Sequence, residues 1–212
     1  MGTGYCWRCG GSDPESLFCK YCNSLQAPIT DYYNFFGLPK KLTIDLDDLQ
    51  RRFYNLSRSL HPDHYTRATP QERQYSLEAT SILNDGYRIL RDPVQRAEYI
   101  LKEAGFDIGE QRTKDVPPEL LEEVFELNMQ LDELRSGDED ARRPLEESRE
   151  RFTGLQQDVD RQLVGLFLAY DSARSPEAAH KALADIRAVL NRRRYIRNLL
   201  REVDKELTAR PV

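Results

Sequence analysis

The most regular pattern in the chain is a run of apolar residues at helical spacing over residues 45–60. Its members follow one another at intervals of four, three and four residues: Leu49, Phe53, Leu56 and Leu60. This spacing is typical of a helix that buries one face. The opposite face is polar and basic, with Arg51, Arg52, Asn55 and Arg58. Pro62 disfavours helical geometry in the residue before it, so we expect the helix to end at about His61.

A second amphipathic helix follows a short loop at residues 64–69. Pro70 suits the first turn of a helix. The apolar positions after it recur at intervals of three and four residues: Tyr75, Ala79, Ile82, Gly86 and Leu90. The two helices should form a hairpin with His61-Pro62-Asp63 at its tip. Taken alone, such a tripeptide is an ordinary helix stop, in which a proline stands before a capping aspartate.

Shorter helices are expected on either side of this hairpin. Residues 31–36 form a brief helix that Thr30 or Asp31 can cap and that Gly37 ends. An aspartate–proline pair opens a further helix at residues 93–104.

The C-terminal part reads as three long helices joined by short connections. The helical runs cover residues 118–135, 145–170 and 176–207. Short connections make neighbouring helices antiparallel, so a three-helix bundle is expected. The predicted core stripes are Leu120, Val124, Leu127, Leu131 and Leu134, then Phe152, Leu155, Val159, Leu163, Leu166 and Tyr170, then Ala182, Ile186, Val189, Ile196, Leu200 and Val203. The fold class is therefore all-α.

Two of these helices carry apolar residues outside the core stripe. In the first, Leu121, Phe125 and Met129 form a second row, with Glu126 and Glu133 beside or near it. In the last, Tyr195 points away from the stripe. Exposed apolar residues rimmed by acids mark protein-binding patches. The alternative is that the second row packs against the N-terminal helices.

Four cysteines lie within the first two dozen residues, in the pattern C-x2-C-x9-C-x2-C: Cys6, Cys9, Cys19 and Cys22. Each C-x2-C pair can span one edge of a tetrahedral ion. Gly10 and Asn23, which follow the two pairs, tolerate the left-handed backbone of a metal knuckle. The pattern predicts a small zinc ribbon, and Trp7, Phe18 and Tyr21 are expected to cover the metal.

Three other interpretations of the cysteines are open. Iron in a rubredoxin-like site uses similar spacing, and we favour zinc over it. Disulfides are the second alternative, which a reducing compartment disfavours. The third is a catalytic redox pair, but two pairs are present and no βαβ pattern of the thioredoxin type accompanies them.

Composition and charge exclude several other classes of function. Charged residues make up 32% of the 212 residues and the net charge is -5, which argues against non-specific nucleic-acid binding. No stretch approaches the roughly 20 apolar residues of a membrane span. The three histidines belong to no visible catalytic set, so no enzyme is expected. The first residues resemble neither a signal peptide nor a presequence.

The motifs around the hairpin, taken together, resemble a J-domain, and the wider chain resembles the HscB family of iron–sulfur cluster co-chaperones. The motifs are Asp31-Tyr32-Tyr33, Phe36-Gly37-Leu38, His61-Pro62-Asp63, Asn84-Asp85-Gly86-Tyr87-Arg88-Ile89-Leu90, Asp92-Pro93 and Arg96-Ala97 with Tyr99. The resemblance covers almost the whole chain, because some relatives also carry an N-terminal four-cysteine segment. It implies a zinc ribbon at 1–27, a J-domain at 31–104 and a scaffold-binding helical bundle at 117–208.

The resemblance also implies two protein partners. His61, Pro62 and Asp63 would contact a chaperone ATPase of the HscA or DnaK type and accelerate its ATP hydrolysis, with Arg51, Arg52 and Arg58 steering toward an acidic patch. An IscU-type scaffold protein carrying the nascent cluster would bind the C-terminal bundle. The matching positions there are Leu121, Phe125, Glu126, Met129, Glu133 and Tyr195. The family occurs in bacterial cytoplasm and in mitochondria, and the missing presequence favours the bacterial cytoplasm.

Two rival functions remain open at this point. The first is a general J-protein that delivers unfolded clients, although no Gly/Phe-rich linker or β-rich client region is visible. The second is an iron or redox sensor built on the four cysteines, with the helices as a dimerisation scaffold. Inert zinc would favour the co-chaperone, and redox-active iron would favour the sensor.

Overall fold

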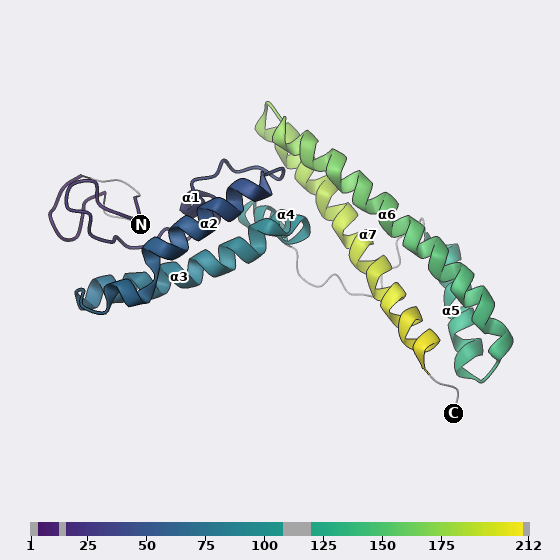
Figure 1. The fold of residues 1–212 in the computed structure, drawn as a ribbon. Helices are drawn as coiled ribbons and strands as arrows, with labels where there is room; N and C mark the ends of the chain where they lie inside the picture. Colours follow the sequence, from purple (N-terminus) through teal and green to yellow (C-terminus); the bar gives the residue numbers. More distant parts are fainter. Residues whose placement is uncertain (1–3, 13–15, 108–119, 210–212) are drawn as a thin grey trace. The chain divides into compact units, whose positions relative to one another are not determined.

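The computed structural model describes residues 4–12, 16–107 and 120–209, and its regular structure in these ranges is helical (Figure 1). Two isolated antiparallel bridges, Tyr5 with Ser12 and Phe18 with Leu25, occur in the N-terminal segment. The predicted all-α class is confirmed. The chain divides into two compact units, Met1–Tyr99 and Ile100–Val212. None of the helices described is long and apolar enough to cross a lipid bilayer.

The first unit contains the predicted hairpin. Its elements, in chain order, are α1 (Tyr32–Phe36), α2 (Leu46–Leu60), the 3-10 helix η1 (Pro62–Tyr65) and α3 (Pro70–Arg91), and the division from the second unit falls within α4 (Pro93–Glu103). The predicted caps of α1 are present. The Asp31 carboxylate accepts from the Asn34 amide at 2.8 Å, and Gly37 ends α1 with a φ of 63°. The loop expected at residues 64–69 is wrong at residues 64 and 65, which are the last two residues of η1.

The junction between α2 and α3 is held by hydrogen bonds from α3. The last carbonyl of α2, that of Leu60, accepts from the Ser76 hydroxyl at 2.7 Å and from the Thr80 hydroxyl at 3.2 Å. Both α2 and α3 bury leucines against each other, and Leu49, Leu60 and Leu83 are almost fully buried. The α2 carbonyl that has no partner within its own helix is thereby satisfied.

The second unit contains a long antiparallel pair of helices, α6 (Arg142–Asp171) and α7 (Pro176–Thr208), which Figure 1 shows side by side. A shorter helix, α5 (Leu121–Arg135), and the 3-10 helix η3 (Glu139–Ala141) precede them. The predicted three-helix bundle is therefore present. The expected start of the first bundle helix at residue 118 lies outside the described residues.

The predicted core stripes are correct for α5 and need adjustment elsewhere. All five predicted core residues of α5 are buried. In α6, Phe167 is buried while Leu155, Leu166 and Tyr170 are half-buried, and in α7, Leu199 is buried in place of Leu200. The reason is length, because α5 has 15 residues and α6 has 30, so α5 cannot cover the whole of α6. The face that α6 buries therefore changes along its length.

In the α2–α3 hairpin the predicted stripes are also only partly buried. Phe53, Leu56, Tyr75 and Ile82 are half-buried, and Leu83 is a buried apolar residue that the pattern did not include. Phe53 stacks on the Tyr87 ring with the centroids 4.3 Å apart. Aromatic residues at the edge of the hairpin therefore cover one another.

A polar pair lies inside the bundle. The Ser148 hydroxyl of α6 donates to the Gln130 side-chain oxygen of α5 at 2.7 Å, and both residues are buried. Because a buried polar group without a partner is costly, this pair favours one pairing of α5 with α6 over shifted alternatives.

We expect Gly86→Val to destabilise the first unit and Gly154→Val to leave the protein nearly unchanged. A β-carbon at Gly86 would lie 2.9 Å from the Tyr32 ring and 3.0 Å from the Phe36 ring, whereas none of the described atoms lies within 4 Å of one at Gly154. Overpacking of this kind costs about 1–3 kcal/mol. Urea unfolding followed by circular dichroism measures both variants, and equal stability of the two would contradict the packing of α1 on α3.

Candidate functional site

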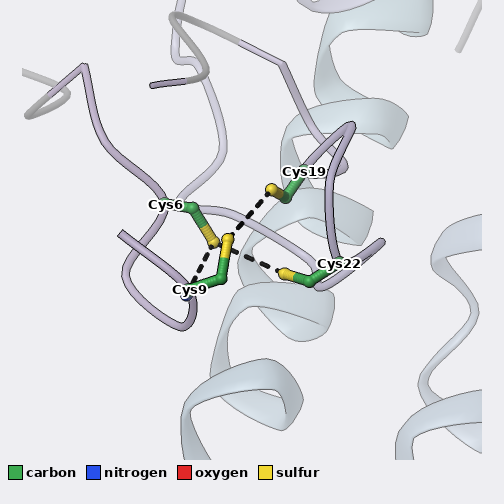
Figure 2. Close-up of side chains that lie close together, drawn as sticks. All are labelled: Cys6, Cys9, Cys19 and Cys22. Atoms are coloured by element: carbon green, nitrogen blue, oxygen red, sulfur yellow. Dashed lines mark hydrogen bonds between the residues drawn. The ribbon is translucent and has the colours of Figure 1, made fainter. Parts of the chain in front are cut away.

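The four cysteine sulfurs form one cluster in the first unit. All four lie within 4.8 Å of one another (Figure 2). The Cys6 and Cys22 sulfurs are 3.7 Å apart, as are those of Cys9 and Cys19. A tetrahedral zinc with Zn–S bonds of about 2.3 Å requires sulfurs about 3.8 Å apart. The cluster therefore fits a tetrahedral metal ion, and a set of thiolates suits a soft or borderline metal.

Each cysteine pair is part of a tight turn. The Gly10 amide donates to the Cys6 carbonyl at 2.9 Å, and the Asn23 amide donates to the Cys19 carbonyl at 2.8 Å. Gly10 and Asn23 have φ values of 70° and 54°, so both adopt the predicted left-handed conformation. These turns aim backbone amides at sulfur, and the Arg8 amide lies 3.4 Å from the Cys6 sulfur.

The pKa values of the thiols show that the four sulfurs are not equally easy to deprotonate without a metal. Burial raises the pKa of Cys6, but hydrogen bonds from Ser24 and from two backbone amides outweigh it and lower that pKa to about 5. At Cys9 a backbone hydrogen bond lowers the pKa, but burial and the neighbouring thiols outweigh it and raise it to about 12. Four thiolates at this spacing repel one another, and a bound cation removes that repulsion.

The side chains around the cluster include residues outside the predicted aromatic set. Of that set, Tyr21 is 65% exposed. The Trp7 ring lies edge-on to Tyr75 of α3 with the centroids 6.4 Å apart. Ser24 is buried, and its hydroxyl lies 3.4 Å from the Cys6 sulfur and 3.1 Å from the Cys22 sulfur. Sequence reasoning missed Ser24, although its position two residues after the second pair was a usable signal.

Gln26 is the second residue that sequence reasoning missed. Its side-chain amide donates to the Cys6 sulfur at 3.4 Å and to the Ser24 carbonyl at 2.8 Å. The hydrogen-bonding side chains of Ser24 and Gln26 therefore line this side of the cluster.

The tripeptide lies at an exposed turn between α2 and α3. His61 caps η1, and its Nδ1 accepts from the Asp63 amide at 3.3 Å. That nitrogen also lies 3.6 Å from the Asp63 carboxylate. The His61 side chain is 53% exposed and that of Asp63 is 85% exposed. Both polar side chains are thus available to a partner, while the backbone beneath them is held in place.

The predicted basic face contains arginines with different roles. Asp48 pairs with Arg51 at 3.1 Å and with Arg52 at 2.7 Å, and its hydrogen bond from Arg52 is the main cause of a lowered pKa. Arg52 also donates to the Phe36 carbonyl at 3.0 Å and to the Gly37 carbonyl at 2.9 Å, so it joins α2 to the end of α1. Arg51 and Arg58 are exposed.

In the second unit, the second row of α5 is exposed. Leu121, Phe125 and Met129, which we call the α5 row, are 56%, 67% and 50% exposed. Glu126, beside the row, pairs with Arg151 of α6 at 3.1 Å, and Glu133 is also exposed. The row therefore lies on a face of α5 that the bundle leaves uncovered.

Tyr195 of α7 lies level with the α5 row along the axis of the bundle. Arg135 at the end of α5 pairs with Glu202 at 2.7 Å and with Glu206 at 3.1 Å, which are 67 and 71 residues further along the chain. The helices α5 and α7 run in the same direction with the same rise per residue. Residues of α5 that lie level with Tyr195 are therefore found by subtracting 67 and 71 from 195, which gives residues 124–128. Tyr195 is half-buried, and burial raises the pKa of its phenol.

Comparison with known proteins identifies both parts of the chain. A family model described as "DnaJ domain" matches residues 31–99, and one described as "HSCB C-terminal oligomerisation domain" matches residues 116–204. The chain is 36% identical over 121 residues to the co-chaperone protein HscB homolog of Bordetella avium, which covers 57% of this chain and 71% of that protein.

The iron-sulfur cluster co-chaperone protein HscB of Homo sapiens is 32% identical over 143 residues, or 64% of this chain and 61% of the human protein. The Mus musculus protein is 30% identical over 137 residues, or 62% of this chain and 58% of that protein. The aligned region thus spans about three fifths of these two relatives.

Solved structures agree with this result. The crystal structure of human co-chaperone protein HscB superposes with a TM-score of 0.71 and 25% identity, covering 95% of this chain and 97% of that one. Chaperone HscB from Vibrio cholerae gives a TM-score of 0.56 at 25% identity, covering 82% of this chain and 95% of that one. With a J-domain match followed by an HscB C-terminal match, and with relatives of that name in both sequence and structure, the chain belongs to the HscB family of co-chaperones.

Proposed function

We propose that this protein binds an IscU-type scaffold, delivers it to a chaperone of the HscA or DnaK type, and stimulates that chaperone's ATPase to promote transfer of an iron–sulfur cluster. The observation that carries the proposal is the exposed His61-Pro62-Asp63 turn. The Ser76 hydroxyl of α3 holds the carbonyl of Leu60 directly before this turn, and the same chain also matches the HscB C-terminal model. In this proposal the chain itself hydrolyses nothing.

The tripeptide turn suits a contact that must be made in one conformation. His61 and Asp63 are exposed, and contacts with α3 and within η1 hold the backbone between them. A preorganised binding group loses less conformational entropy when its partner docks. His61, Pro62 and Asp63 would therefore contact the ATPase without a prior rearrangement of the turn.

The arginines of α2 would add electrostatic attraction to the same contact. Arg51 and Arg58 are exposed to an approaching acidic partner, with Arg51 also paired with Asp48, whereas Arg52 is bonded to the end of α1. Charges at the rim of an interface mainly affect the association rate. We therefore expect Arg58 and Arg51 to act on encounter, and Arg52 to act largely through the position of α2.

The scaffold would bind the α5 row. Phe125 is the most exposed of its three residues, and Tyr195 lies at its height. Aromatic residues of this kind are enriched among interface hot spots. Met129 offers a flexible thioether that adapts to a partner surface. Glu126 and Glu133 would set orientation, and Glu126 is itself oriented by its pair with Arg151.

Because the two binding surfaces belong to one chain, binding of the scaffold raises its effective concentration near the chaperone. In the proposal, delivery means this increase in the concentration of the scaffold near the chaperone. The match of residues 116–204 to the HscB C-terminal model supports this specialised role over a general J-protein for unfolded clients. The remaining rival, a redox sensor, depends on the metal in the cysteine cluster.

We propose that this metal is zinc and that its role is structural, with iron as the alternative. The ligands would be Cys6, Cys9, Cys19 and Cys22. Two pairs of their sulfurs are 3.7 Å apart, close to the separation that zinc requires, and all four lie within 4.8 Å of one another. The zinc would neutralise the thiolates and hold the two turns together.

The first prediction is that the purified protein contains one zinc per chain and that Cys9→Ser abolishes it. Most of the helical signal should persist in the variant, because the helices beyond residue 30 have their own buried core. Elemental analysis and far-ultraviolet circular dichroism make the two measurements. Stoichiometric redox-active iron would favour the sensor, and collapse of the whole helical signal would contradict a helical core that folds independently of the metal.

The second prediction is that His61→Gln abolishes stimulation of an HscA- or DnaK-type ATPase while leaving scaffold affinity unchanged. The reason is that His61 is exposed and contributes to neither apolar core. Steady-state ATP hydrolysis measures the effect, and calorimetric titration of the scaffold checks the second binding surface. His64→Gln is the matched control, since His64 is exposed in the same turn. Equal stimulation by His61→Gln and the parent protein would refute the assignment.

The third prediction is that Phe125→Ala and Tyr195→Ala each weaken scaffold binding by about 1–3 kcal/mol, the range typical of interface hot spots. Calorimetric titration of the scaffold measures the change. Leu168→Ala is the control, because Leu168 is a 55% exposed apolar residue of α6. If both aromatic variants bind like Leu168→Ala while remaining folded, the scaffold site lies elsewhere.

A further inference from the structure

The first cysteine turn contacts α3 through the two side chains between its ligands. Trp7 lies edge-on to Tyr75, and its indole N–H donates to the Leu25 carbonyl at 2.7 Å. Arg8 pairs with the Glu72 carboxylate at 3.6 Å. Arg8 is 54% exposed at its side chain, but Glu72 is only 10% exposed, so the pair is shielded on one side. The metal-binding segment therefore lies against the first two turns of α3.

Those same two turns of α3 hold both ends of the tripeptide turn. At its start, Ser76 donates to the carbonyl of Leu60, the residue directly before His61. At its end, Glu72 forms a capping box with Thr69: its carboxylate accepts from the Thr69 amide at 3.3 Å and from the Thr69 hydroxyl at 3.0 Å. Glu72 is thus shared, with one oxygen toward Arg8 and the other toward Thr69.

We propose that Trp7 and Arg8 are positioning residues for His61-Pro62-Asp63, acting through Glu72 and Tyr75, so that a metal-loaded N-terminal segment keeps the tripeptide turn in its ATPase-binding conformation. The effect on ATPase stimulation rests on the function proposed above, whereas the effect on the turn itself does not. This assigns the cysteine segment a role in the activity of the J-domain.

Metal is required in this arrangement because the segment has little core of its own. Among its described residues, Leu25 is the one buried apolar residue besides the ligands Cys6 and Cys19, and its cysteines repel one another as thiolates. Segments of this size depend on a metal or a disulfide for their fold. When the metal is removed, the backbone between Cys6 and Cys9 loses its fixed geometry, and Trp7 and Arg8 lose their alignment with α3.

The second half of the segment provides an internal control. Tyr21 is one of the two residues between Cys19 and Cys22, as Arg8 is between Cys6 and Cys9. Its ring contacts Gly11 and Lys20, both in the same segment. A change at Tyr21 perturbs the metal segment without touching Glu72 or Tyr75.

The test is amide hydrogen exchange of residues 61–69 in the zinc-loaded full chain, compared among the parent, Arg8→Ala, Glu72→Gln and Tyr21→Ala. Glutamine at position 72 retains a capping box but loses the charge that pairs with Arg8. We expect exchange about fivefold faster in Arg8→Ala and Glu72→Gln, the factor that corresponds to roughly 1 kcal/mol. Tyr21→Ala should match the parent, and residues 121–208 should be unchanged in every variant. Zinc analysis of each sample shows that the metal is retained.

Chelation of zinc from the parent protein should reproduce the faster exchange of residues 61–69. Trp7→Ala should also speed the exchange of these residues. If Trp7→Ala loses its metal, Arg8→Ala is the variant that decides the proposal. Unchanged exchange in Arg8→Ala, in Glu72→Gln and after chelation would overturn the proposal.

ATPase stimulation separates this proposal from the proposed function. Arg8→Ala should require a higher concentration for half-maximal stimulation, with a smaller change in the maximum than His61→Gln produces. If the parent protein stimulates no ATPase, the proposed function fails, while hydrogen exchange still decides the effect on the turn. If exchange rises but stimulation is the same as in the parent, the positioning role is refuted.

Discussion

The structure of the first unit depends on how α3 satisfies the end of α2. The Leu60 carbonyl has no partner within its own helix, and Ser76 and Thr80 supply two hydroxyl donors to it. Pro62 ends α2, and this contact holds the end of α2, directly before His61, against α3. A buried carbonyl without a partner would cost a few kcal/mol, so the turn after Leu60 has little freedom to shift. The hydrogen bonds from Ser76 and Thr80 hold the backbone directly before the tripeptide, while its His61 and Asp63 side chains stay exposed.

Buried polar groups are paired with each other elsewhere in the chain as well. Gln130 and Ser148 bond to each other inside the bundle, and Arg96 is buried between the carbonyls of Leu42 and Leu90. Each case satisfies buried polar groups that hydrophobic packing alone would leave unpaired. These contacts select one arrangement among several that the apolar stripes would allow. The side chains proposed to contact partners are, by contrast, largely exposed.

The cysteine segment links metal chemistry to this framework. Four thiolates in proximity are stable only with a cation among them. The turns that hold the cysteines also hold Trp7 and Arg8 against α3. A metal site of this kind therefore contributes more than local stability, since the residues between its ligands reach a neighbouring element.

The sequence by itself determined the helices, their caps, the cysteine cluster and the tripeptide turn. These features depend on local rules: the 3.6-residue period, the chemistry of capping residues and the spacing of ligands along the chain. It also identified the α5 row, since Phe125 lies off the stripe formed by Val124 and Leu127. The family resemblance rests on motifs that are each contiguous in the chain, so it does not depend on how the helices pack.

Only the tertiary structure decided which of several candidate residues meet. The rotation of α6 buried Phe167 rather than Leu166, because α5 is too short to cover the whole helix. The Trp7 ring packed edge-on to Tyr75, and Arg52 bonded to the end of α1. Contacts between residues dozens of positions apart depend on how helices rotate and pack. Sequence periodicity specifies a helical face, but it does not specify which neighbour that face meets.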